Sequence, residues 1–197
     1  MNTMNGKKYM IIDGLPVAIE GEKNILSLVR KAGIELPTLC YYSELSTYGA
    51  CRMCVFENER GGIDASCSAQ PRAGMVIKTN TPRLRKYRKM VLELLLANHC
   101  RECTTCSKSN NCKLQEFALR YNLSGVRFPN SAKDGGADDS SLSIVRTPNK
   151  CILCGKCVRM CNEVQNVGAI DYGFRSSKMK IVTAFDGEIA NSPCVGC

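Results

Sequence analysis

The sequence predicts an α+β fold, and two features carry that prediction. Two β-prone runs, 8–12 and 15–19, flank an Asp13-Gly14 turn, a dipeptide that suits the backbone of a two-residue hairpin. Fourteen cysteines then follow in separate groups, and the last of these groups dominates residues 150–197. A small sheet is therefore expected first, with units built around cysteines after it.

The sheet is expected to lie within residues 1–80. Asn24 can cap a short helix whose apolar residues recur at helical spacing and which Gly33 would end. Further strands are expected at 53–58 and 75–78. A hairpin, a crossing helix and later strands together predict a β-grasp arrangement.

A longer helix is expected to begin at Thr81-Pro82, where a capping residue precedes proline at the first helical position. Its apolar stripe is assigned to Leu84, Tyr87, Val91, Leu94 and Leu95. Its charged residues are assigned to a solvated face: Arg83, Arg85, Lys86, Arg88 and Lys89. A second helix is expected at 114–122. The predicted domains are 1–80, 81–130 and 150–197, with a linker at 131–149 that is rich in Ser, Asp and Gly.

The high cysteine content and the expected compartment together predict metal sites. Residues 1–8 hold no apolar run of signal-peptide length, and no stretch approaches the roughly 20 apolar residues of a membrane helix. We therefore expect a cytoplasmic protein, in which clustered reduced cysteines indicate metal sites in preference to a disulfide scaffold. The formal charge of +9 would allow nucleic-acid binding. Thiolate-bound clusters of about −2 each would cancel much of it, so we expect no nucleic-acid partner.

The first cysteine group is Cys40, Cys51, Cys54 and Cys67. A C-x2-C pair on a small, flexible loop brings two sulfurs together, and backbone N–H groups there can point at sulfide. Placed after a β-grasp-like hairpin and helix, the four favour a [2Fe–2S] cluster, although the spacing is a variant of the plant ferredoxin pattern. A structural zinc site with four thiolates is the alternative.

The second group is His99, Cys103, Cys106 and Cys112. One imidazole and three thiolates can hold a [4Fe–4S] cluster, with the imidazole making it less negative, or can hold zinc. His99 is the only histidine of the chain and stands at the head of the cysteine run, which favours its being a ligand. Cys100 is left without an assigned role, and two interpretations stay open: a free thiol, or a competitor of His99 for the iron.

The third group is the most specific local signal: Cys151, Cys154, Cys157 and Cys161, the C-x2-C-x2-C-x3-C run of bacterial ferredoxins. In two-cluster ferredoxins the fourth cysteine of each run binds the other cluster. Cys151, Cys154 and Cys157 are thus assigned to one [4Fe–4S] site without a fourth ligand. Cys161, Cys194 and Cys197 are assigned to a second, incomplete [4Fe–4S] site, so we expect the chain to be part of a longer polypeptide.

The order of these groups resembles the N-terminal region of [FeFe] hydrogenase catalytic subunits of the NAD(P)-linked, electron-bifurcating type. The large iron–sulfur subunit of complex I and NAD-linked formate dehydrogenases have a similar beginning. The resemblance covers nearly the whole chain and is carried by the segments 39–41, 49–54, 99–115, 143–146, 151–159 and 163–170.

The resemblance implies a β-grasp [2Fe–2S] ferredoxin domain, a small helical domain with a His-ligated [4Fe–4S] cluster, and a truncated bacterial-type 2[4Fe–4S] ferredoxin domain. It implies an electron relay to a hydrogenase active site that these residues do not contain, with no catalytic residue of its own. The implied hetero-oligomeric partners are a flavin- and NAD(P)-binding subunit, a small [2Fe–2S] thioredoxin-like subunit and ferredoxin.

Two other interpretations stay open. The chain could be the relay arm of an NAD-linked formate dehydrogenase or of a complex I-like enzyme. It could also be a zinc protein that binds nucleic acid and has no redox role, in which case a purified sample would contain zinc and neither iron nor sulfide.

Overall fold

The computed structural model describes residues 3–4, 7–131 and 136–197. Part of the predicted linker, 132–135, lies outside the described residues, as do residues 1–2 and 5–6 of the N-terminal segment. The chain divides into two compact units. The first comprises Met1–Tyr41, Thr47–Val91 and Phe117–Asn122, and the second comprises Tyr42–Ser46, Leu92–Glu116 and Leu123–Cys197.

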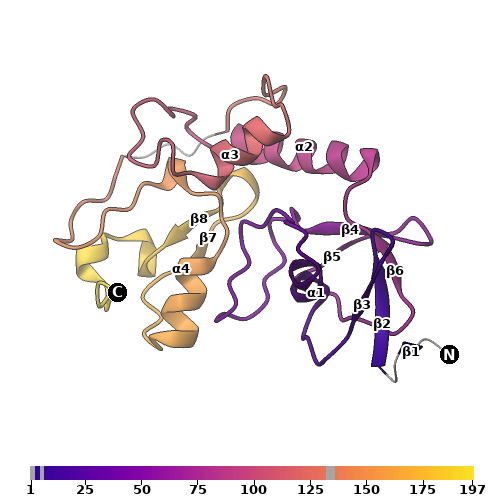
Figure 1. Cartoon of the computed structure of the whole chain (residues 1–197). Helices are drawn as coiled ribbons and strands as arrows, with labels where there is room; N and C mark the ends of the chain where they lie inside the picture. The colour runs from indigo at the N-terminus through magenta and orange to yellow at the C-terminus, as the bar shows by residue number, and fades with distance from the viewer. Residues whose placement is uncertain (1–2, 5–6, 132–135) are drawn as a thin grey trace. The chain divides into compact units, whose positions relative to one another are not determined.

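The first unit contains a mixed sheet (Figure 1). Its strands are β1 (Thr3–Met4), β2 (Lys7–Ile12), β3 (Leu15–Ala18), β4 (Val55–Asn58), β5 (Ile63–Ala65) and β6 (Val76–Lys78). The order is β1-β2-β6-β4-β5, and β3 pairs with β2. The β2–β6 pair is parallel, whereas the other pairs are antiparallel. The described residues thus confirm an α+β fold for this part of the chain.

Local signals explain the first elements. The β2–β3 hairpin turns at Asp13 and Gly14, whose φ angles of 50° and 88° are the positive values that this turn requires. Helix α1 (Ile25–Lys31) begins at the predicted cap, because the Asn24 side chain accepts a hydrogen bond from the Ser27 backbone N–H at 3.0 Å. It ends before Gly33, which has a φ of 74°.

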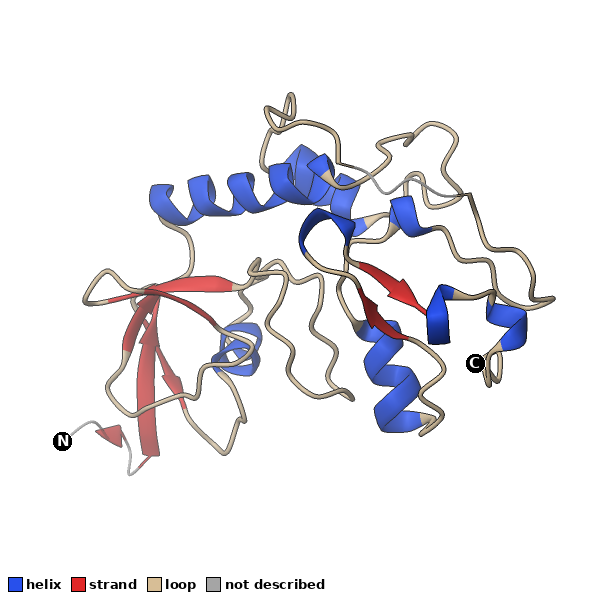
Figure 2. Cartoon of the chain, turned by 180° about the vertical axis from the view of Figure 1, so that it is seen from behind, coloured by secondary structure: helices blue, strands red, loops and turns tan. Residues whose placement is uncertain are grey.

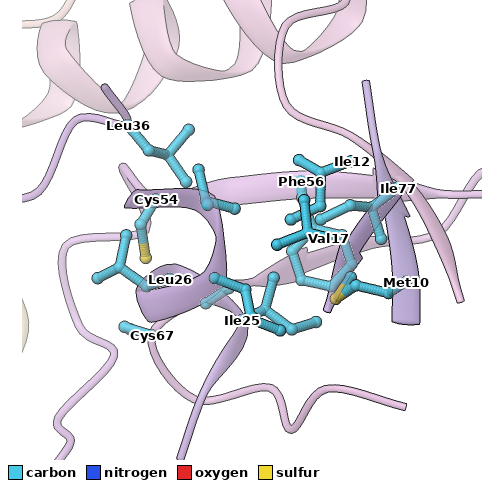
Figure 3. Close-up of a cluster of buried hydrophobic side chains, with 13 residues drawn as sticks. Met10, Ile12, Val17, Ile25, Leu26, Leu36, Cys54, Phe56, Cys67 and Ile77 are labelled. Carbon is cyan, nitrogen blue, oxygen red and sulfur yellow. The ribbon is translucent and has the colours of Figure 1, made fainter. Parts of the chain in front are cut away.

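Helix α1 and the sheet enclose a hydrophobic core (Figure 3). The helix contributes four buried apolar residues, Ile25, Leu26, Leu28 and Val29. The strands contribute Met10, Ile12, Val17, Phe56, Ala65 and Ile77. Two cysteines, Cys54 and Cys67, belong to the same core, so part of the first cysteine group lies inside the packed interior.

Helix α2 (Pro82–Ala97) begins where the sequence predicts, and the Thr81 hydroxyl accepts from the Leu84 N–H at 3.1 Å. The prediction of its faces is partly wrong. Arg88, expected on the solvated face, is 2% exposed, whereas Leu94 of the apolar stripe is 48% exposed. The buried side of the helix runs through Leu84, Arg88 and Leu92 at four-residue spacing, and polar partners of Arg88 from distant segments make its burial possible.

The second unit has long loops and short regular elements (Figure 2). Helix α3 (Lys113–Arg120), whose residues from Phe117 onward belong to the first unit, confirms the predicted second helix and ends two residues early. Helix α4 (Lys156–Arg159) continues as a π-helical turn, Met160–Val164. The strands β7 (Asp171–Gly173) and β8 (Lys180–Val182) pair antiparallel, and the 3-10 turns are Pro148–Lys150, Ser176–Lys178, Ala184–Asp186 and Ile189–Asn191. In the described part of the chain, every helix is too short or too polar to cross a bilayer.

Candidate iron–sulfur cluster sites

The first cysteine group is buried. Cys40, Cys54 and Cys67 are each 1% exposed, and Cys51 is 8% exposed. Cys40, Cys51 and Cys54 lie on the loop between α1 and β4, and Cys67 follows β5. The structure therefore brings residues from two loops into one region of the first unit.

The four sulfurs interact as two pairs. The Cys40 thiol is a hydrogen-bond partner of the Cys51 sulfur, which lowers the pKa of Cys51 to about 5 and raises that of Cys40. The Cys67 thiol lowers the pKa of Cys54 to about 6, while Cys54 raises that of Cys67. Charges on Cys40 and Cys51 also raise the pKa of Cys67, so the two pairs interact electrostatically.

Backbone and hydroxyl donors support negative charge on these sulfurs. The backbone amides of Met53, Cys40 and Leu39 contribute to the lowered pKa of Cys51. Ser66 holds the Cys54 turn, because its hydroxyl and its N–H both donate to the Cys54 carbonyl, at 2.7 and 3.0 Å. Buried thiolates with N–H donors are the setting that a cysteine-ligated cluster requires, so the residues present fit such a group.

The second group lies between α2 and α3. The loop turns through Cys103 and Cys106, where the Cys106 N–H donates to the Cys103 carbonyl at 3.4 Å and the Lys108 N–H donates to the Cys106 sulfur at 3.5 Å. Cys112 immediately precedes α3. The three cysteines are half-buried. This loop contains an amide-to-sulfur hydrogen bond of the kind that tunes a cluster.

His99 lies two residues after the end of α2. The Arg101 N–H donates to His99 Nδ1 at 3.3 Å, and the Cys100 sulfur lies 3.8 Å from the same nitrogen. Nδ1 is therefore an acceptor in the contact with Arg101. The Cys100 N–H is bonded to the Asn149 carbonyl at 2.9 Å.

The third group begins on a tight turn and ends on a helix. Leu153 and Gly155 have φ angles of 55° and 68°, and the Leu153 N–H donates to the Cys151 sulfur at 3.4 Å. Desolvation by neighbouring protein atoms, together with charge on Cys151 and Cys154, raises the pKa of the Cys157 thiol, so these three thiols lie near one another.

Cys161 lies in the π-helical turn after α4 and is buried. Its sulfur accepts from the Ala169 N–H at 3.2 Å. The same helical segment is held by Glu163, whose carboxylate accepts from the Ser46 N–H at 2.8 Å and from its hydroxyl at 2.5 Å. Cys194 is half-buried, and Cys197 is exposed.

Among residues 3–4, 7–131 and 136–197, no three or more His, Cys, Asp or Glu side chains are arranged to hold a single metal ion. Sequence reasoning missed two residues that support the first group: Ser66 and the buried Arg88. The only sequence feature that points to Ser66 is its position beside Cys67. The feature that points to burial of Arg88 is its four-residue spacing from Leu84 and Leu92.

Comparison with protein families identifies two iron–sulfur regions. Residues 9–82 match the 2Fe-2S iron-sulfur cluster binding domain, and residues 88–127 match the NADH-ubiquinone oxidoreductase-G iron-sulfur binding region. The first match contains all four cysteines of the first group, and the second contains His99 and its three cysteines. These matches indicate a [2Fe–2S] and a [4Fe–4S] cluster as the cofactors of this chain.

Curated relatives are subunits of NAD(P)-linked oxidoreductases by name. The chain is 36% identical over 197 residues to the NADP-reducing hydrogenase subunit HndD of Solidesulfovibrio fructosivorans, covering 94% of this chain and 33% of the relative. It is 34% identical over 177 residues to the mitochondrial NADH-ubiquinone oxidoreductase 78 kDa subunit of Neurospora crassa, covering 88% and 24%. The chain thus spans a third or less of the length of these relatives.

A solved structure has the same fold. A chain of an NAD+-reducing [NiFe]-hydrogenase in the H2-reduced state superposes with a TM-score of 0.87 and 27% identity, covering 94% of this chain and 79% of that one. The sequence, the two family matches and this fold together show that the chain is similar to the N-terminal iron–sulfur region of NAD(P)-linked hydrogenases and of complex I.

Proposed function

We propose that this chain is an electron relay, in which iron–sulfur clusters pass single electrons between a flavin subunit that oxidises NAD(P)H and a hydrogenase active site outside residues 1–197. The observation that carries the proposal is the order of cysteine groups, because the first two groups coincide with the [2Fe–2S] and [4Fe–4S] family matches. The clusters would supply the electron-accepting chemistry, and the chain's residues hold and insulate them.

The proposed ligands are the groups that the spacing of the cysteines defines. Cys40, Cys51, Cys54 and Cys67 would hold the [2Fe–2S] cluster in a β-grasp ferredoxin domain, and their burial would keep water from it. His99, Cys103, Cys106 and Cys112 would hold a [4Fe–4S] cluster. The third group would hold up to two more [4Fe–4S] clusters in a partial ferredoxin domain: Cys151, Cys154 and Cys157 for one, and Cys161, Cys194 and Cys197 for the other.

The proposed setting is a cytoplasmic hetero-oligomer. Its partners would be the flavin- and NAD(P)-binding subunit, a small [2Fe–2S] thioredoxin-like subunit and ferredoxin. Support comes from relatives named as subunits of a hydrogenase and of NADH-ubiquinone oxidoreductase and from the hydrogenase structure.

The ligand sets are tested by a pair of variants. Iron and sulfide content and redox-poised EPR would be measured on the full chain after anaerobic purification, for the wild type, Cys54→Ser and Cys106→Ser. We expect the first variant to lose the [2Fe–2S] signal alone and the second to lose the His-led [4Fe–4S] signal alone. A colourless wild type that contains zinc and no iron or sulfide would overturn the relay proposal, whereas joint loss of both signals in either variant would overturn the separate ligand sets.

The terminal reaction is tested on the intact complex from its native source. We expect NAD(P)+ to be reduced with H2 as the electron donor. Reduction with formate, or NADH-dependent reduction of a quinone, in the absence of any reaction with H2 would replace the hydrogenase assignment while leaving the relay role in place.

A further inference from the structure

Arg88 is a buried cation in the first unit. It lies on α2 and is 2% exposed, a position that an arginine rarely takes without partners. Its guanidinium has three carbonyl partners. Nε donates to the Met53 carbonyl at 3.0 Å, and Nη2 donates to the Val55 carbonyl at 2.5 Å and to the Thr79 carbonyl at 2.9 Å.

Two of these carbonyls flank Cys54. Met53 precedes the cysteine and Val55 follows it, so one planar group holds both sides of the turn. The third carbonyl follows β6, which ties the turn to the end of the sheet. Since a trans peptide directs its N–H opposite to its carbonyl, Arg88 also fixes the direction of the Cys54 amide and of the amide that follows Val55.

The carbonyl between them is held independently. The Cys54 carbonyl accepts from the Ser66 hydroxyl and N–H. Three successive carbonyls of the ligand turn are therefore hydrogen-bonded to buried donors. This leaves the turn little freedom to change its shape when the charge of a bound group changes.

The positive charge of Arg88 also acts on the first cysteine group. Burial lowers the pKa of Arg88, and the Tyr121 hydroxyl and the Cys54 sulfur oppose that shift, while Arg120 adds to it. Nε and Nη2 bond the carbonyls on either side of Cys54, so the guanidinium is close enough for an electrostatic interaction with charge at this site. In a low-dielectric interior such an interaction is weakly screened.

We propose that Arg88 is a positioning residue of the first cluster site: it fixes the turn that carries Cys54 and raises the reduction potential of the [2Fe–2S] cluster bound there. The proposal rests on the ligand set proposed above. Reduction adds one electron to a cluster that is already anionic, and a nearby buried positive charge favours the more negative state.

The test compares three variants of the full chain by redox titration of the [2Fe–2S] EPR signal. Arg88→Met removes the charge and the hydrogen-bonding fork, and Arg88→Lys keeps the charge without the fork. Lys86→Met is the matched control, because it removes one positive charge from an exposed position of the same helix. The His-led cluster serves as an internal reference in every sample.

We expect Arg88→Met to lower the reduced-to-oxidised ratio at fixed potential at least tenfold, which is a fall of about 59 mV for one electron. Lys86→Met should shift the ratio much less, because solvent screens its charge. Arg88→Lys should stay close to the wild-type midpoint and retain less cluster. A shift in Arg88→Met no larger than that of Lys86→Met would overturn the proposal.

If Arg88→Met assembles no [2Fe–2S] cluster, the result for Arg88→Lys decides whether the proposal holds. A wild-type midpoint at reduced content, or loss of the [2Fe–2S] signal alone, would support the proposal. Loss of the His-led signal as well would overturn it, because Arg88 would then act on general stability. If the wild type itself has no [2Fe–2S] signal, the proposed ligand set fails, which is distinct from a failure of Arg88.

Discussion

The first and second units present cysteines in different surroundings. In the first unit, Cys54 and Cys67 belong to the core formed by α1 and the sheet (Figure 3). In the second unit, Cys103 and Cys106 are half-buried in a loop, and Cys157 is exposed. The first site is therefore supported by hydrophobic packing, whereas the second set of sites is held by turns, short helices and isolated hydrogen bonds.

The difference in burial indicates the source of the folding energy at each site. Apolar burial can organise the first group before any metal binds, because most members of the core around Cys54 and Cys67 are apolar side chains of α1 and the sheet. The loops of the second unit bury fewer large side chains. There, ligand bonds to iron would supply part of the folding energy, as they do in small metal-dependent domains.

Removal of iron should produce the largest difference in stability between the two units. After anaerobic chelation we expect amides of β2, β4 and β6 to keep their protection from hydrogen exchange, and amides at 101–112 and 151–157 to lose theirs. Mass spectrometry of peptides from the loaded and the chelated chain measures this. Equal loss of protection in both units would show that the first site also depends on its metal for folding.

A core truncation should act on the first unit. Phe56 is fully buried in the sheet core, and Phe56→Ala should cost about 3–5 kcal/mol of its stability through lost burial and a cavity. Leu142→Ala is the control, since Leu142 is fully exposed at 108% and should change stability by less than about 0.5 kcal/mol.

Urea unfolding, followed by the [2Fe–2S] absorbance and by the His-led EPR signal, measures the stability of each unit by its own signal. A Phe56→Ala effect of the same size on both signals would mean that the units unfold together.

Exchange of His99 for cysteine tests the ligand assignment within the second unit. His99→Cys should lower the midpoint potential of its [4Fe–4S] cluster by about 60 mV or more, a tenfold change for one electron, because a fourth thiolate adds negative charge. Redox-poised EPR measures the midpoint, with Cys100→Ser as the neighbouring control. An unchanged midpoint in His99→Cys would count against His99 as a ligand.

The smallest effect is expected from a single carboxylate of the second unit. The Asp138 carboxylate accepts from the Ser140 hydroxyl at 2.7 Å, from Arg146 at 2.5 and 3.0 Å, and from the Ile189 N–H at 2.9 Å. The hydroxyl and the guanidinium hold the pKa of Asp138 well below its usual range. Its ionised form is therefore favoured in the folded state.

The contribution of Asp138 should be present above the unfolded pKa, near 4, and should be lost as pH falls toward the lower folded value. The unfolding free energy of the wild type minus that of Asp138→Asn should thus decrease between about pH 5 and pH 3. Asp139→Asn, at the exposed neighbouring position, is the control. A difference that does not change with pH would contradict this role.

Local signals predicted the elements that depend on neighbouring residues. The Asp13-Gly14 turn and the Asn24 cap lie where expected, because a turn or a cap needs only residues close in sequence. Strand β5 was not predicted, since its three residues are ordered by pairing with β4. The β7–β8 hairpin was likewise missed, because it lacks a strong alternating pattern.

The candidate ligands are a prediction from residue spacing, whereas their surroundings could not be predicted from the sequence. Spacing grouped the cysteines, since ligands of one metal site recur in short motifs. The four-residue spacing places Arg88 on the face of Leu84 and Leu92, but its burial also depends on carbonyl partners from residues 53, 55 and 79, which the helix alone does not reveal. A polar residue on a helix is assigned to solvent unless such distant partners are known.

The near-complete burial of the first cysteine group has a consequence for how the protein is made in a cell. Iron and sulfide cannot reach cysteines that are only 1–8% exposed without an opening of the loops around them. Cluster delivery must therefore occur on the newly synthesised chain before this unit closes, or wait for a rare local unfolding event. Cells that overproduce the chain faster than they supply clusters should accumulate a folded, empty first unit whose loading rate is set by that opening.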